Sequence, residues 1–302
     1  MRPRPAPWRR AFTAWMLVAS AVALMLDVKP AKTQTPLDVY RERVAMSAAG
    51  AQCRLFNADL TDALAVGAAQ ARTVALRAGY TSQALESGAD DARSQVSRMA
   101  CGSGRVQDAA VRARDAFRAY SGLQRMVFPG DLGAWRADRA MPLQSASWRL
   151  AQDAWAGEDR MVFGLAGLHG ADTVAVAVAS ADGASPYGAR LILRDPARLA
   201  EPLFHHGASP LADRAPLRAA AQVILADARA PADPALRPRG ADKAVEFRFP
   251  AATEQALQRL DPREAVSVEI LYPSDRGDMV RTAFLEVGDF DAGVAFLKTG
   301  PR

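Results

Sequence analysis

The stretch Val266-Ser-Val-Glu-Ile-Leu-Tyr272 places apolar side chains at positions 266, 268, 270 and 272, with Ser and Glu between the first three. Because a strand sends successive side chains to opposite faces, this period predicts a strand with one buried face. Residues 174–178 and 245–249 follow the same period, and weaker candidates lie at 148–155, 160–165, 189–194, 222–228 and 280–287. Gly, Pro and Asp separate these strands at hairpin-like spacing. We therefore expect residues 147–300 to form a β-rich domain, a mainly antiparallel β-sandwich or partly open barrel.

Two short helices interrupt the strands of this domain. Residues 251–260 and 289–298 carry apolar side chains at helical spacing, and Asp289 is a suitable N-cap for the second helix. Residues 129–146 and 229–241 show neither period and are predicted to be loops.

The preceding region, residues 35–128, has the period of helices. Thr35 followed by Pro36 predicts a helix start, because the hydroxyl can cap and the proline lacks an N–H that would go unpaired. Three further helices are predicted at 53–78, 81–101 and 103–127, with stripes rich in alanine. We expect a helical hairpin or small bundle. The fold class is thus α+β, with a helical domain at 35–128 followed by the β-rich domain at 147–300.

Cys53 and Cys101 are the only cysteines of the chain. Two thiols in one small exported domain usually pair, and this bridge would stabilise the domain by roughly 4 kcal/mol on the chain-entropy estimate. The alternative, a reactive redox pair, lacks the C-x-x-C spacing that lowers a thiol pKa. We expect a structural disulfide.

The first residues have the layout of a secretory signal. Four arginines precede an uncharged run from Ala11 to Leu26, and small residues favour cleavage after Ala21 or Ala23. The alternative is an uncleaved membrane anchor, although the run is shorter than the roughly 20 residues that a spanning helix needs. Residues 1–23 are therefore predicted to be a signal peptide, and the remainder to be periplasmic or secreted.

The signal also accounts for most of the positive charge. The net charge of the full chain is +5, and four arginines but no acid precede residue 24, so a cleaved chain carries about +1. Binding to nucleic acid usually needs a clear excess of Lys and Arg to neutralise phosphates. We therefore exclude nucleic acid as a partner.

Two segments resemble the invasion-associated locus B family. They are Ala189-Arg-Leu-Ile-Leu-Arg-Asp-Pro196 and the closing Leu285-Glu-Val-Gly-Asp-Phe-Asp-Ala-Gly-Val-Ala-Phe-Leu297, within a similar layout that starts at Trp148. The resemblance covers about half of the chain and implies a secreted β-rich domain, a binding or envelope role and no established catalysis. Members commonly carry cysteines in that domain, which this chain lacks, and the helical half has no counterpart. The resemblance assigns no functional residue.

Catalytic and metal motifs are scarce in the sequence. The histidines are His169, His205 and His206, without the H-x-x-x-H or H-E-x-x-H spacing of a zinc site. Together with His205 or His206, Ser209 and Asp213 supply the residue types of a Ser-His-Asp hydrolytic triad. No G-x-S-x-G elbow surrounds the serine, however. The turn around Gly277, between Asp275 and Asp278, is predicted to be a hairpin rather than a calcium loop.

Three tryptophans follow the signal, at Trp135, Trp148 and Trp155, where the helical half meets the β-rich half. We expect them to pack in the core or between the domains. The alternative is a stacking platform for the sugar rings of envelope glycans, because tryptophan combines a wide apolar face with a polar N–H.

The sequence alone favours an exported cell-envelope protein that acts as a non-enzymatic binding or scaffolding module. No cofactor, catalytic residue or metal ligand is predicted, and the expected partner is an envelope protein or glycan. The competing hypothesis is a hydrolase acting on envelope material, with a site near His205, His206 and Ser209.

Overall fold

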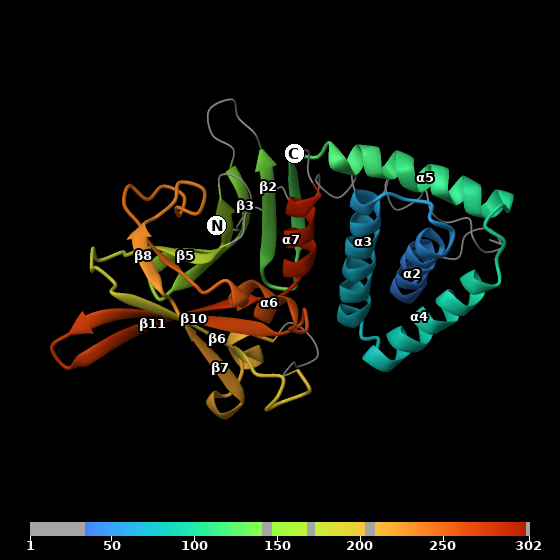
Figure 1. The fold of residues 1–302 in the computed structure, drawn as a ribbon. Helices are drawn as coiled ribbons and strands as arrows, with labels where there is room; N and C mark the ends of the chain where they lie inside the picture. The colour runs from blue at the N-terminus through green and yellow to red at the C-terminus, as the bar shows by residue number, and fades with distance from the viewer. Residues whose placement is uncertain (1–33, 141–146, 168–172, 203–208, 300–302) are drawn as a thin grey trace, which may run out of the picture. The chain divides into compact units, whose positions relative to one another are not determined.

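A computed structural model describes residues 34–140, 147–167, 173–202 and 209–299. The chain forms two compact units, Met1–Gly122 and Leu123–Arg302, which are described separately. The first unit is helical and the second holds the strands, as Figure 1 shows, so the α+β class predicted from the sequence is confirmed. The predicted signal, residues 1–23, lies outside the described residues. None of the helices in the described ranges is long and apolar enough to cross a membrane.

The helical unit is a small bundle of α2 (Pro36–Cys53), α3 (Ala58–Arg77), α4 (Ser82–Ser97) and α5 (Gly104–Ser121) (Figure 1). The predicted start at Thr35 is confirmed: its hydroxyl accepts from the backbone N–H of Asp38, whose carboxylate in turn accepts from the backbone N–H of Thr35. This capping box satisfies two N–H groups that the helix leaves without partners.

Three helix boundaries differ from the prediction by four or more residues, and one of them is the end of the third helix, at Ser97 instead of residue 101. The first helix runs to Cys53, and the second begins only after Asn57, whose side chain caps it. Between them Arg54 takes a left-handed conformation with φ 50°, which ends α2. The last helix ends at Ser121 instead of residue 127, because Arg125–Pro129 pairs with a strand of the second unit.

Small residues make up much of the bundle core. Ala75, Ala89 and Ala92 are buried beside Tyr40 and Leu85, and these residues come from α2, α3 and α4. Alanine leaves no long side chain between helices, so the helices approach closely but each buries little apolar area. The unit therefore gains from a covalent bridge.

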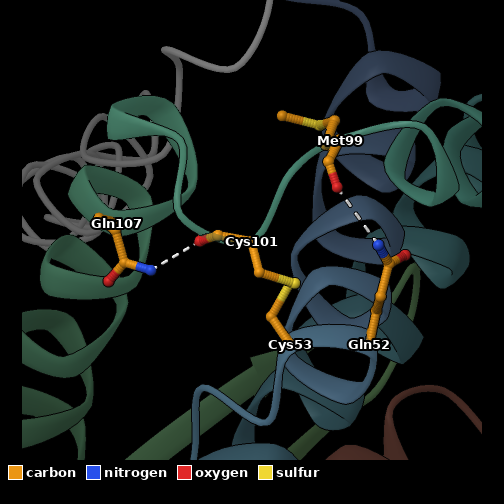
Figure 2. The surroundings of a disulfide bond; sticks show 5 residues. All are labelled: Gln52, Cys53, Met99, Cys101 and Gln107. Carbon is orange, nitrogen blue, oxygen red and sulfur yellow. Dashed lines mark hydrogen bonds between the residues drawn. A yellow bond between two sulfur atoms is a disulfide. The ribbon is translucent and has the colours of Figure 1, made fainter.

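That bridge is the disulfide between Cys53 and Cys101, which is present as predicted. It joins the last residue of α2 to the connection between α4 and α5, with the two Cα atoms 5.5 Å apart. Figure 2 shows glutamines on both sides: Gln107 Nε2 donates to the Cys101 carbonyl at 2.7 Å, and Gln52 Nε2 donates to the Met99 carbonyl at 3.4 Å. The residues around Cys101 are thus held to helices α2 and α5 by both covalent and hydrogen bonds.

The second unit contains two antiparallel sheets, and the described strands form no closed barrel. One sheet has seven strands in the order β1-β2-β3-β4-β5-β9-β8, and the other has four in the order β11-β10-β6-β7. Their bounds are β1 Arg125–Pro129, β2 Ala134–Ala140, β3 Ser147–Ala156, β4 Asp159–Gly167, β5 Thr173–Ala179, β6 Gly188–Arg194, β7 Ala221–Leu225, β8 Ala228–Pro231, β9 Val245–Arg248, β10 Ala265–Ser274 and β11 Gly277–Glu286. Part of the predicted loop 129–146 is therefore strand β2, and the start of the predicted loop 229–241 belongs to β8.

Two α-helices belong to this unit, as predicted: α6 (Ala252–Gln258) and α7 (Phe290–Lys298), together with the short 3-10 turns η2 (Leu211–Arg214) and η3 (Arg218–Ala220). Helix α7 packs on β2 and β3 (Figure 1). There the Trp135 ring of β2 contacts Phe290 of α7, with ring centroids 5.1 Å apart. This face of the seven-stranded sheet holds the apolar core and is called the inner face.

The two sheets are joined by hydrogen bonds between β3 and β11. The Gln152 side chain donates to the Glu286 carbonyl at 3.1 Å and accepts from the Glu286 N–H at 2.9 Å. The Glu286 carboxylate accepts from three backbone N–H groups of residues 131–133, between β1 and β2, at 2.8 to 2.9 Å. Because these groups are buried, their polar atoms need such partners.

Candidate functional site

The strands of the seven-stranded sheet send alternate side chains away from the core, onto what is called the outer face. In β2, Ala137 is buried on the inner side, whereas Arg136 and Asp138 project to the outer face. The register places Arg125 of β1, Asp138 of β2 and Arg149 of β3 directly opposite one another. A row of charged side chains therefore crosses three strands.

Residues 232–244, between β8 and β9, lie over this outer face. Leu236 of this segment is buried in a small apolar cluster with Ala151, Val162 and Ala177 of the sheet. The backbone N–H of Asp233 donates to the buried Glu246 carboxylate at 2.8 Å, and Arg149 Nη1 donates to the Ala235 carbonyl at 2.8 Å. Most of the segment belongs to the predicted loop 229–241, and these contacts hold it against the sheet.

A pocket of about 360 Å³ opens between this segment and the strands. Its volume lies within the range typical of small-molecule sites. It is lined by Arg125, Arg136, Arg149, Asp153, Val162, Arg237 and Arg239. Five of the seven lining residues are arginines, so guanidinium groups dominate the chemistry of the pocket.

Asp138 fixes two of these arginines. Its carboxylate is buried and accepts from Arg125 Nε and, at 2.6 Å, from Arg149 Nε. Burial alone would raise the pKa of Asp138, but the hydrogen bonds from the two arginines outweigh it and lower the pKa below its usual value. Asp138 is therefore ionised at neutral pH and orients both guanidinium groups.

The remaining arginines are less fully neutralised. Arg136 Nη2 lies 2.8 Å from the Asp153 carboxylate in an exposed pair. Arg237 and Arg239 are exposed, and neither forms an ion pair with any carboxylate of the described residues. Five guanidinium groups thus face two carboxylates, and the pocket keeps a net positive charge. Guanidinium groups form paired hydrogen bonds to carboxylates and phosphates, so this arrangement can bind an anion.

The hydrolytic residues considered from the sequence are only partly described. His169, His205 and His206 lie outside the described residues. Ser209 Oγ accepts from Arg214 Nε at 3.2 Å, and Asp213 is exposed in η2. A guanidinium stays protonated and cannot act as a general base, so the contact with Arg214 does not activate the serine.

Among the described residues, no group of three or more His, Cys, Asp or Glu side chains could hold a metal ion. The predicted turn around Gly277 is confirmed as a hairpin. Ser274 pairs with Gly277, which has φ 106°, and Asp275 and Arg276 form the connection.

The three tryptophans differ in burial. All three lie in β2 and β3 of the second unit. Trp135 is buried, and its Nε1 donates to the Val287 carbonyl at 2.9 Å, so packing is confirmed for this residue. Trp148 is half-buried, whereas Trp155 is 62% exposed. Core packing therefore does not account for Trp155.

Sequence reasoning missed the arginine pocket. Its residues are spread from position 125 to position 239, and two of them lie in a stretch predicted to be a loop. One signal was present: Arg149, Asp153 and Trp155 occupy alternate positions of a predicted strand and therefore share one face.

The chain was also compared with known proteins. No protein-family model, no curated protein and no solved structure matches it.

Proposed function

We propose that the chain is an exported, non-enzymatic binding protein of the cell envelope whose β-rich unit binds an anionic ligand. The observation that carries the proposal is the excess of five guanidinium groups over two carboxylates around one pocket of about 360 Å³. A concave site lined by one sign of charge attracts ligands of the opposite charge.

The composition of the pocket favours binding over catalysis. Its only acidic lining residue, Asp153, is paired with Arg136, and Asp138 beneath it is held by two arginines. Hydrolysis by general acid–base catalysis needs a group with a pKa near the working pH. The lowered pKa keeps the Asp138 carboxylate ionised, so Asp138 does not supply that group and instead orients the guanidinium groups of Arg125 and Arg149.

Export is supported by the N-terminal sequence and by the disulfide. The charged-then-apolar layout of residues 1–26 is typical of a secretory signal, and disulfides persist mainly outside the reducing cytosol. Cell fractionation tests this part: we expect the protein outside the cytoplasm with its two thiols unreactive toward a thiol label until a reductant is added. Cytosolic protein with two labelled thiols would contradict it.

Anion binding is tested by calorimetry with tripolyphosphate, a small anion without a sugar. We expect binding that weakens between 50 and 200 mM salt, and at least a tenfold loss in the double variant Arg237→Gln/Arg239→Gln. Both arginines are exposed, so the substitutions should leave the fold intact. Arg218→Gln, which changes an exposed arginine of the same unit outside the pocket, is the matched control. Equal affinity in all three proteins would overturn the proposal.

A further inference from the structure

Trp155 is an exposed residue of β3, the strand that also carries Arg149 and Asp153 of the arginine pocket. It is 62% exposed, so its indole offers a wide apolar face that a ligand can cover. It is followed by the turn that joins β3 to β4, and its register partner on β4 is Arg160. The strand register therefore fixes its neighbour, and the alternation along β3 places its side chain on the outer face.

The register also places Trp155 beside the pocket. Asp153, which lines the pocket, is two residues earlier on the same strand, so both side chains leave the outer face about 7 Å apart. Arg160 Nη1 donates to the Arg239 carbonyl at 2.6 Å, which ties the strand beside Trp155 to the pocket segment. An apolar platform and a cationic pocket are thus neighbours on one surface.

The groups on this surface match three features of one class of ligand. The arginines can bind an acidic group, and the indole face can cover the apolar face of a ring. The Asp153 carboxylate, whose side chain is 56% exposed, can accept hydrogen bonds from hydroxyl groups. A carboxylate in the wall repels a bare anion but favours a ligand that also carries hydroxyls.

We infer that the arginine pocket and Trp155 together bind an acidic saccharide, with the acid group among the arginines and a sugar ring stacked on the indole. This inference rests on the proposed anion-binding function and names its ligand class. The pocket volume of about 360 Å³ is at the small end for ligand sites, so it takes one acidic residue while a neighbouring ring lies on Trp155.

The test uses the full-length chain and four probes: tetragalacturonate, its uncharged methyl ester, a phosphorylated maltotriose and tripolyphosphate. We expect at least one acidic saccharide to bind, at least ten times more tightly than the neutral ester, and to change the tryptophan fluorescence. Trp155→Ala should weaken that binding at least tenfold and leave tripolyphosphate binding within twofold. Leu217→Ala removes an apolar side chain that is 70% exposed elsewhere on the unit and is the matched control. Circular dichroism checks that both variants are folded.

The outcomes separate the two proposals. If Trp155→Ala binds the acidic saccharide as tightly as the unchanged protein, or if neither acidic saccharide binds while tripolyphosphate does, the saccharide inference fails and anion binding stands. If the neutral ester binds as tightly as the acid, the role of the arginines is wrong. If the unchanged protein binds none of the four probes, both proposals fail. Binding of tetragalacturonate alone or of the phosphorylated sugar alone identifies the acid group as carboxylate or phosphate.

Discussion

Arg194 and Glu264 form a buried ion pair with two parallel hydrogen bonds. Arg194 Nε and Nη2 donate to the two Glu264 carboxylate oxygens at 2.7 and 2.8 Å, and both side chains are at most 5% exposed. Arg194 Nη1 donates to the Leu199 carbonyl at 2.6 Å and to the Ala200 carbonyl at 3.1 Å. The pair therefore joins the end of β6 to the residues before β10 and orders the chain that leaves the sheet.

Glu264→Gln should strongly destabilise the β-rich unit. The amide leaves the buried Arg194 guanidinium without its counter-charge, which typically costs about 3–5 kcal/mol. Urea unfolding followed by tryptophan fluorescence reports this unit, because the tryptophans of the described residues all lie in it. Glu158→Gln, an exposed change in the β3–β4 turn, is the control. A loss below 1 kcal/mol in Glu264→Gln would show that the pair contributes little.

Removing the disulfide should weaken the helical unit selectively. The bridge spans a sequence separation of 48 residues, for which the chain-entropy estimate gives about 4 kcal/mol. The alanine-rich core has little burial to offset that loss. We expect Cys53→Ser/Cys101→Ser to lower the urea midpoint of the helical circular dichroism signal while the tryptophan transition stays within experimental error. A parallel loss in both signals would contradict a separate effect.

Tyr272 should make the β-rich unit sensitive to alkali. Burial and its hydrogen bond to the Asp159 carboxylate raise the pKa of Tyr272 to about 12. Because the folded-state pKa lies above the unfolded value of about 10, the tyrosine contributes stability that is complete below pH 10 and is lost as the pH rises toward 12. Over that window the contribution falls by roughly 1.4 kcal/mol per pH unit.

The comparison protein is Tyr272→Phe, which lacks the ionising hydroxyl. At pH 7 we expect it to be less stable by about 1–3 kcal/mol, because Asp159 loses a buried donor although Arg281 Nη1 still donates to it at 2.6 Å. Between pH 10 and pH 12 its free energy of unfolding should fall less steeply than that of the unchanged protein. Identical slopes in urea titrations at these pH values would refute the assignment.

Asp138→Asn should lower the stability of the β-rich unit and raise its affinity for anions. The substitution removes one of the two carboxylates around the pocket, so tripolyphosphate should bind several-fold more tightly at low salt. It also puts an NH2 group where one carboxylate oxygen stood, so only one of Arg125 and Arg149 keeps its acceptor, at a cost of about 1–3 kcal/mol. Because the lowered pKa of Asp138 makes the unchanged protein lose this contribution as the pH falls below about 4, the variant should show a weaker acid dependence. Calorimetry and acid titration measure the two effects.

Most of the fold could be predicted from sequence patterns among neighbouring residues. The Thr35 cap, the strand around Val268 and the closing helix at Phe290 each depend on residues close in sequence, and each is present. The errors arose where pairing between distant residues decides the outcome. Residues 134–140 show no clean alternation, because Asp138 is buried between two arginines on the outer face while Arg139 is buried on the inner face.

The candidate site was harder to predict than the fold, because its residues come together only through contacts between positions far apart in the sequence. The strand register places Asp138 opposite Arg149. Arg237 lines the same pocket because the neighbouring Leu236 is buried in the apolar cluster on the outer face of the sheet. No spacing rule connects these positions in sequence. The disulfide was predictable because the chain offers only two cysteines, whereas the arginines of the pocket are five among many.

One wall of the pocket is the segment 232–244, which carries Arg237 and Arg239 and connects β8 to β9. Loops of this kind tolerate insertion and exchange better than the strands beneath them. Under the proposed function, changes in this segment can alter ligand preference while the strands stay the same, and exchanging the segment is a direct route to engineered specificity.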